Sequence, residues 1–225
     1  MRFIDLSHTI EHGLITYKGL PAPIICDFLS REQSTQHYAP GTQFQIGKID
    51  MVANTGTYLD SPFHRYEDGK DLSELELTSL ANLDGRVLRA KGEGLRAKGE
   101  APRAIDANAL EGIDVEGKAV LIETNWARHW RTDKYFAGTH PFLTKDAAQL
   151  LADSRAVLVG IDSYNIDDTS DLTRPAHSIL LGAGIPIVEH MCNLDQLPKS
   201  NFKFFAVPIK VKGMGTFPVR AFAIV

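Results

Sequence analysis

Cysteine is scarce in this 225-residue chain, and positive charge is not in excess. Only Cys26 and Cys192 occur, without CxxC spacing, which argues against a disulfide framework and against a CxxC redox or zinc motif. The chain has 24 Lys plus Arg and 28 Asp plus Glu, and its formal charge of −4 leaves no excess of positive charge that would favour binding to nucleic acid. No apolar run approaches the length of a membrane span, and Asp5 interrupts the N-terminal stretch too early for a signal peptide. We therefore expect a cytoplasmic protein with neither a nucleic-acid nor a membrane partner.

Motifs for nucleotides and for covalent nucleophiles are also missing. The glycines fit neither a dinucleotide fingerprint nor a P-loop, so no nucleotide cofactor is expected. A Gly-x-Ser-x-Gly motif is absent, and neither cysteine has a histidine at a spacing that would recommend it as a base. The apolar fraction of 44% and charged fraction of 23% are ordinary for a globular protein, and the length predicts a single domain over residues 1–225.

The middle of the chain alternates strand and helix patterns. Residues 119–123 are a continuous apolar run typical of a buried strand, Thr144 can cap a helix that runs to about Ala152, and residues 156–161 are a second buried strand. This pattern predicts a βαβ unit. Further strands are expected at residues 3–10, 42–53 with a bulge near Gly47, 185–189, 204–211 and 218–224, and helices at 71–80 and at 175–182, closed by Gly182. Together they predict an α/β fold with a mixed sheet.

Two connections between these elements stand out. Residues 89–93 and 96–100 form a short charged, glycine-containing duplication, which we interpret as an exposed loop insertion without catalytic meaning. The 124–143 connection is long and aromatic, and it contains Trp126 and Trp130. Such a connection is suited to a lid or pocket wall for a flat substrate, with both tryptophans lining the pocket. The alternative is that its aromatics pack onto their own domain or onto a neighbouring subunit.

Residues 54–64, Asn-Thr-Gly-Thr-Tyr-Leu-Asp-Ser-Pro-Phe-His, look like one wall of a site. Gly56 and Pro62 make a continuous helix unfavourable. Alternate side chains of an extended segment share a face, so Asn54, Tyr58 and Asp60 would point the same way. The simpler alternative is a polar edge strand that runs into a turn.

This stretch resembles the His-x-Gly-Thr-His-x-Asp-x-Pro-x-His motif of the cyclase family of hydrolases, which includes bacterial kynurenine formamidase and isatin hydrolase. The matching residues are Gly56, Thr57, Asp60, Pro62 and His64. Asn54 and Tyr58 stand where the family has two metal-ligand histidines. Residues 160–167 are similar to the family's Gly-x-Asp-x-x-Ser-x-Asp segment, and the block 177–197 carries its other metal-site pair, His177 and Glu189. The likeness runs from Asp5 to Ile224 and implies the swivelling β/α/β fold of that family.

The resemblance also implies a chemistry. A divalent metal, zinc or manganese, would be held by Asp60, His177 and Glu189 and would activate water to attack an N-formyl or cyclic amide. His64 would shuttle protons, so that His64, Asp60 and Tyr58 form the catalytic set, with Asn54 in the substrate pocket. It implies a homodimer or homotetramer as well.

The two substitutions leave the metal and the reaction open. An asparagine amide is a weak zinc ligand and tyrosine a rare one, so the metal site is altered and binding at it weakened. The remaining residues could hold one metal among oxygen ligands, or act as a metal-free acid–base cluster in which Tyr58 orients a substrate carbonyl. A hydrolase of small amides, a metal-free lyase or isomerase, and a ligand-binding protein without turnover therefore all remain possible. A buried salt-bridged network is the non-functional alternative for the same residues.

Overall fold

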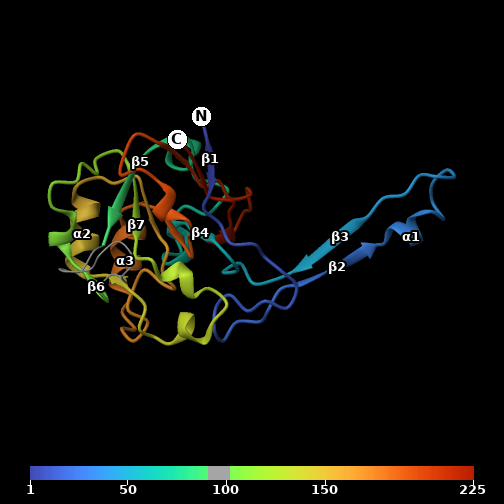
Figure 1. The fold of residues 1–225 in the computed structure, drawn as a ribbon, viewed down its shortest axis with the longest axis horizontal. Helices are drawn as coiled ribbons and strands as arrows, with labels where there is room; N and C mark the ends of the chain where they lie inside the picture. The colour runs from blue at the N-terminus through green and yellow to red at the C-terminus, as the bar shows by residue number, and fades with distance from the viewer. Residues whose placement is uncertain (91–101) are drawn as a thin grey trace.

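The computed structural model describes residues 1–90 and 102–225 (Figure 1). Its main sheet has nine strands in the order β1-β13-β11-β5-β7-β9-β10-β4-β12. Their bounds are β1 Phe3–Asp5, β4 Tyr58–Asp60, β5 Leu83–Arg89, β7 Ala119–Glu123, β9 Leu158–Ile161, β10 Ile187–Glu189, β11 Lys203–Phe205, β12 Thr216–Pro218 and β13 Phe222–Ile224. Two small sheets pair β2 Ile24–Leu29 with β3 Ile46–Asp50, and β6 Ala104–Ile105 with β8 Phe142–Leu143.

Three α-helices and several short 3₁₀ turns connect the strands. The α-helices are α1 Arg31–Ser34, α2 Lys145–Asp153 and α3 Pro175–Gly182. The 3₁₀ helices are η1 Pro62–His64, η2 Leu77–Ser79, η3 Ala107–Leu110, η4 Trp126–His129, η5 Asp133–Phe136 and η6 Leu194–Gln196. Within the described residues, every helix is too short or too polar to cross a membrane.

The sheet is mixed, as the sequence predicts. Its central strands β5, β7, β9 and β10 are parallel neighbours, whereas β1, β4, β11, β12 and β13 pair antiparallel on either side. The predicted βαβ unit is confirmed: β7 and β9 pair in parallel, and α2 connects them. Because β7 is buried on both faces from Ala119 to Ile122, these four residues are all apolar rather than alternating with polar ones.

Two hydrophobic cores lie on opposite faces of this sheet. Along β7, Leu121 belongs to one core, whereas Val120 and Ile122 belong to the other, as the alternation of side chains in a strand requires. Helices α2 and α3 cover the second core (Figure 1). The first core takes residues from both ends of the strand order, including Ile4 of β1 and Leu59 of β4, because the sheet curls around it. The backbone closes this curl where Ser7 bridges to Met191.

The largest departure from the predicted elements is at residues 42–53. Instead of joining the main sheet, β3 pairs only with β2, and the two strands with α1 form an arm, residues 24–50, that projects from the body (Figure 1). The predicted irregularity is present on the partner strand: the register shifts between Asp27 and Leu29, opposite Gly47 and Ile46. The alternation of apolar residues identified a strand, but it carries no information about which strand is the partner.

Other elements are shorter than predicted, or differently paired. The first strand ends at Asp5, and only Leu77–Ser79 of the 71–80 segment is helical. The C-terminal region forms three short strands rather than two, and β12 pairs with β4 at the opposite edge from β11 and β13. Gly182 lies inside α3, and the glycine with the left-handed backbone is Gly184. In the duplicated segment, Arg89 ends β5 and forms an ion pair with Glu123, whereas residues 91–100 of the predicted loop lie outside the described residues.

Candidate active site

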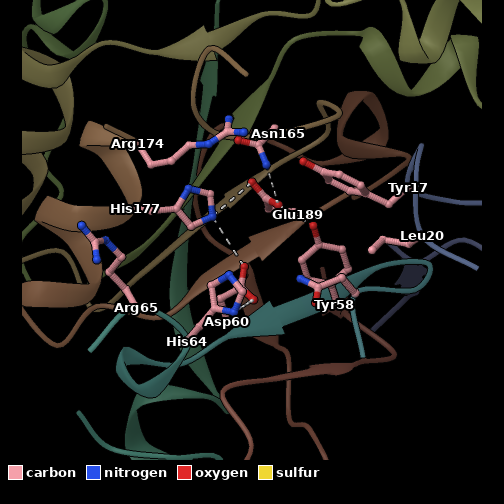
Figure 2. A pocket seen from close by; sticks show the side chains of 11 residues that line it. Tyr17, Leu20, Tyr58, Asp60, His64, Arg65, Asn165, Arg174, His177 and Glu189 are labelled. Carbon is pink, nitrogen blue, oxygen red and sulfur yellow. Dashed lines mark hydrogen bonds and ion pairs between the residues drawn. The ribbon is translucent and has the colours of Figure 1, made fainter. Parts of the chain in front are cut away.

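One cavity gathers the predicted catalytic and metal-ligand residues together with Asn54 (Figure 2). It has a volume of about 240 Å³ and lies where β4, β10 and the segment after β9 end. It is lined by Tyr17, Leu20, Asn54, Tyr58, Asp60, His64, Arg65, Asn165, Arg174, His177 and Glu189. The expected shared face of Asn54, Tyr58 and Asp60 is thus present. Tyr17 and Leu20 precede the arm and Asn54 follows it, so the cavity lies at the root of the arm.

Strand register brings Tyr58 and Glu189 together. The two residues are opposite one another in the antiparallel pair β4–β10, and the Tyr58 hydroxyl donates a 2.6 Å hydrogen bond to Oε2 of Glu189. The backbone N–H of Ile166 donates to Oε1 at 2.6 Å. Burial, together with the charge of Asp60, raises the pKa of Glu189 to about 7. Burial and the Glu189 charge also raise the pKa of Tyr58 well above its usual value, so its hydroxyl keeps its proton.

Asp167 fixes the orientation of His177. Its carboxylate accepts the backbone N–H groups of Ala176, at 2.6 Å, and of His177, at 3.1 Å, and so satisfies the start of α3. The same carboxylate accepts a 2.6 Å hydrogen bond from Nδ1 of His177. The other ring nitrogen, Nε2, therefore faces the cavity, 3.7 Å from Oδ2 of Asp60 and 3.8 Å from Oε1 of Glu189. Burial lowers the pKa of His177, but the surrounding carboxylates outweigh it and raise the pKa to about 10.

Thr216 connects Asp60 to His64. Its hydroxyl donates to Oδ1 of Asp60 and lies 2.9 Å from Nδ1 of His64. A hydroxyl has one proton and a carboxylate only accepts, so Thr216 must accept its second hydrogen bond from Nδ1–H of His64. Neutral His64 consequently carries its proton on Nδ1 and leaves Nε2 as a base. Burial raises the pKa of Asp60, but the positive charges of His64 and His177 and the hydrogen bond from Thr216 outweigh it, so that the pKa lies below its usual value.

A close backbone approach places His64 beside Thr216. A Cβ atom on Gly215 would lie 2.4 Å from the backbone nitrogen of His64, so only glycine allows this approach. The N–H of Ser61 donates to the carbonyl of Gly215 at 2.7 Å, which holds the two segments together. The sequence motif therefore supplies His64, and the distant Gly215-Thr216 segment sets its position.

The matched motif residues Gly56 and Thr57 are structural. Gly56 has φ +68°, and a Cβ there would lie 2.8 Å from the side chain of Ile10. The hydroxyl of Thr57 donates to the carbonyl of His190 at 2.6 Å and accepts the N–H of His8 at 3.0 Å. These contacts tie the motif to the ends of β1 and β10.

The residues present fit one divalent cation. Oδ2 of Asp60 is fully buried and has no hydrogen-bond partner among the described residues, which is costly for a carboxylate oxygen unless a cation satisfies it. It faces Nε2 of His177, and Asp60, His64 and His177 offer ligand atoms within 4.8 Å of one another. Glu189 adds a third donor beside His177. Two carboxylates and an imidazole suit zinc or manganese.

The same geometry does not fit a second cation at Asn54 and Tyr58. The Tyr58 hydroxyl keeps its proton and donates it in the hydrogen bond to Glu189, so it offers no anionic ligand. Asn54 offers only a neutral amide. Asn54 and Tyr58, the altered half of the motif, therefore form a hydrogen-bonding wall of the cavity rather than a set of metal ligands.

Comparison with known proteins agrees with this arrangement. Residues 4–168 match the model of the Cyclase family, which covers more than half of the chain.

The chain belongs to the cyclase family.

Curated relatives in the family are kynurenine formamidases. The chain is 29% identical to that of Geobacillus thermodenitrificans over 219 residues, covering 97% of this chain and 95% of the relative. It is 27% identical to that of Bacillus cereus over 220 residues, covering 97% and 95%. Isatin hydrolase A from Labrenzia aggregata shares the fold, with a TM-score of 0.79 at 22% identity, over 100% of this chain and 93% of the other. The swivelling β/α/β fold of the cyclase family is therefore confirmed.

The two tryptophans expected in the pocket of this cyclase-family chain do not line the cavity. Trp126 is buried, and its indole N–H donates to the carbonyl of Tyr135. Trp130 stacks on His8 with ring centroids 3.9 Å apart. Both belong to an aromatic cluster that packs against Tyr17. The aromatic connection therefore packs onto its own domain and supports the cavity wall from behind.

Sequence reasoning missed several residues of the site. No spacing pattern points to a ligand or a base in the segments that contain these residues, which are Tyr17, Leu20, Arg65, Arg174 and Thr216. Asp167 ends the 160–167 segment that is similar to the family, but the sequence did not show that its carboxylate accepts the free N–H groups at the start of α3.

Proposed function

We propose that this protein is a metal-dependent hydrolase that cleaves the C–N bond of a small formamide or cyclic amide. The observation that carries the proposal is the convergence of Asp60, His177 and Glu189 in one cavity with His64, whose Nε2 is free to act as a base. The names of the kynurenine formamidase relatives support an amide as the bond that is cleaved.

Asp60, His177 and Glu189 would hold the cation. When bound there, a divalent metal supplies Lewis-acid polarisation and a lowered pKa of water. Asp167 contributes by holding one proton of His177 on Nδ1, so that the cation would take the place of the second proton, on Nε2. Tyr58 orients Glu189 instead of a substrate carbonyl, because its one proton is already donated to the Glu189 carboxylate.

His64 would move the protons. Its Nε2 accepts a proton from water as the water oxygen forms a bond to the carbonyl carbon, and the Nδ1–H bond to Thr216 orients the ring during this transfer. The same nitrogen then returns the proton to the amide nitrogen as the C–N bond breaks. The products are a carboxylate and an amine, or one molecule carrying both groups if the amide was cyclic.

Metal content together with turnover tests this proposal. We expect about one equivalent of divalent metal in the purified protein, or after dialysis against zinc or manganese. N-formyl aromatic amides and cyclic amides should then be hydrolysed, and chelation should abolish the activity. Retention of no metal under any of these conditions would contradict the proposal. It would favour metal-free acid–base chemistry or ligand binding, although both leave Oδ2 of Asp60 buried without a hydrogen-bond partner among the described residues.

We also propose that the chain forms a homodimer or homotetramer through the arm, rather than through the 124–143 connection. All residues of β2 and β3 except Leu29 are exposed. The arm exposes Phe28 by 74%, Ile49 by 57% and Phe44 by 53%. An isolated two-stranded hairpin is marginally stable, and apolar side chains on an arm indicate an interface. A second copy would cover them and bring its surface next to the cavity at the arm's root.

Light scattering after gel filtration tests this association. Wild type should elute as a dimer or tetramer, and Phe28→Ser with Ile49→Ser should shift it toward the monomer, because each change removes apolar area from the interface. Leu77→Ser is a matched control, since Leu77 is 65% exposed and lies off the arm. A monomeric wild type, or an equal shift in the control, would show that the arm is not the interface.

A further inference from the structure

One polar side chain of the candidate active site is available to a bound molecule. Asn54 lines the cavity and is half-buried. Among the described residues, its side-chain amide makes no hydrogen bond. A primary amide carries two N–H donors and a carbonyl acceptor, so this side chain brings donors into the cavity that the fold itself does not use.

The backbone beside Asn54 is held by buried contacts. The hydroxyl of Thr55 donates to the carbonyl of Val52 at 2.7 Å, across the residue pair that contains Asn54. The next residue, Gly56, donates its N–H to the hydroxyl of Thr16 at 2.9 Å. Thr55 and Thr16 are both buried. The turn therefore fixes the point from which the Asn54 side chain enters the cavity, and only the side-chain rotamer is left to follow a ligand.

The proposed hydrolysis creates negative charge on one substrate oxygen. The water oxygen forms a bond to the carbonyl carbon as its proton passes to Nε2 of His64, and the second electron pair of the C=O bond moves onto the carbonyl oxygen. That oxygen is an anion in the tetrahedral intermediate. Hydrogen-bond donors placed around it lower the barrier because they bind the anion more strongly than the neutral carbonyl.

Two other neutral donors of the cavity are engaged with Glu189. The Tyr58 hydroxyl donates to Oε2 at 2.6 Å. The side-chain nitrogen of Asn165 faces the same oxygen at 3.4 Å, and its carbonyl accepts the N–H of Asp167 at 3.0 Å, which fixes this orientation. Both side chains thus support the Glu189 carboxylate, and neither is directed at a substrate carbonyl.

The two arginines of the cavity approach it from a different direction. Figure 2 shows Arg65 and Arg174 on one side of the cavity and Tyr58 on the other. Asn54 belongs to the segment that leads into Tyr58 at the start of β4. The guanidinium groups and the Asn54 amide therefore meet different parts of a bound molecule.

Asn54 and the proposed base enter the cavity from opposite ends of β4. Asn54 precedes the strand, and His64 follows it at the end of η1. Asp60 lies between them in the chain, and its Oδ1 is 3.7 Å from Nδ1 of His64. A carbonyl group placed across this part of the cavity can turn its carbon toward a water beside His64 and its oxygen toward the Asn54 amide.

We propose that the side-chain amide of Asn54 donates a hydrogen bond to the carbonyl oxygen of the substrate and stabilises the tetrahedral anion that forms there. Asn54 is then a catalytic residue and not only part of the cavity wall. An amide can turn either of its ends to a ligand, and the negative oxygen selects the N–H end. This inference rests on the proposed hydrolase function, but the affinity for a tetrahedral anion can be measured without turnover.

Binding of phenylboronic acid tests the inference without a substrate. Its trigonal boron takes up hydroxide from water, with release of the proton to solvent, and becomes a tetrahedral anion, whereas benzamide stays trigonal and neutral. In calorimetry, Asn54→Leu removes the donors but nearly keeps the shape, and it should weaken binding of the boronic acid about tenfold or more and of benzamide less than about threefold. Asn54→Ser keeps a donor and should restore part of the affinity. Asn108→Leu, at an exposed asparagine of η3, is the matched control and should change neither.

Turnover of formanilide and thioformanilide shows which substrate atom Asn54 contacts. Asn54→Leu should lower kcat for formanilide about 10²–10³-fold, the usual loss when one oxyanion donor is removed, and should change KM little. Sulfur accepts hydrogen bonds weakly, so kcat for thioformanilide should fall less than about threefold. Metal content and thermal unfolding should match those of wild type.

An equal loss for the two substrates, or for the boronic acid and benzamide, would overturn the inference, because Asn54 would then only shape the cavity. Unchanged kcat and unchanged binding in Asn54→Leu would overturn it too, as would a wild type that binds no boronic acid. Hydrolysis of no formamide or cyclic amide by wild type, with the Asn54-dependent binding of phenylboronic acid intact, would overturn the hydrolase function alone.

Discussion

Replacing His64 with alanine is expected to lower kcat by about 10²–10⁴-fold, the usual loss when a positioned acid–base group is removed. The Nε2 atom that would take the proton from water and return it to the leaving nitrogen is then missing. The fold should persist, because the side chain of His64 is 36% exposed and its hydrogen bond is to Thr216. Steady-state kinetics with a hydrolysed amide measures the loss, and thermal unfolding and metal content establish that the variant is otherwise intact.

Thr216 provides the companion variants. Thr216→Val keeps the shape but removes the hydroxyl that accepts from Nδ1 of His64, so kcat should fall by a smaller factor than in His64→Ala while KM changes little. Thr216→Ser keeps the hydroxyl and should restore most of the activity, which a purely structural role of the threonine methyl group would not allow. Turnover of His64→Ala within twofold of wild type would remove His64 from the mechanism.

The part of the fold that was predictable is the part governed by local pattern. Residues 119–122 and 158–161 carry no polar side chain because their strands are buried on both faces, and the sequence shows this directly. Strand partners depend on distant segments instead. Nothing in residues 42–53 indicates that β3 leaves the body with β2, or that β12 crosses to the edge beside β4.

The candidate site likewise has a part that the sequence predicts and a part that depends on distant segments. The resemblance to the cyclase family, at the 54–64 motif and the 177–197 block, identified Asp60, His64, His177 and Glu189, and the structure brings all of them to one cavity. Thr216 is 152 residues from His64 and acquires its position through the pairing of β12 with β4. The tryptophans were misplaced because aromatic content predicts burial, but it does not distinguish the surface of a pocket from the packing behind it.

The altered half of the motif offers a gain-of-function prediction. Asn54→His combined with Tyr58→His should raise the zinc content from about one to about two equivalents per chain. Zinc favours imidazole ligands, and both positions line the cavity next to Asp60. Since second-shell changes alone alter metal affinity by about 10–100-fold, restoring two direct ligands should raise the affinity for the second zinc by more than that.

Elemental analysis after zinc dialysis and competition with a chelator measures the gain, and neither readout requires turnover. Bound zinc should also stabilise the fold, by about 2.7 kcal/mol at a free concentration 100 times the dissociation constant. Tyr58→Phe is the control, since it releases Glu189 from its hydrogen bond without adding a ligand and should leave the zinc content at one. A double variant that still holds one equivalent would show that positions 54 and 58 do not point at a shared metal position. In that case the correspondence with the family's two histidines would hold in sequence only, and Tyr58 would be part of this chain's own architecture around Glu189.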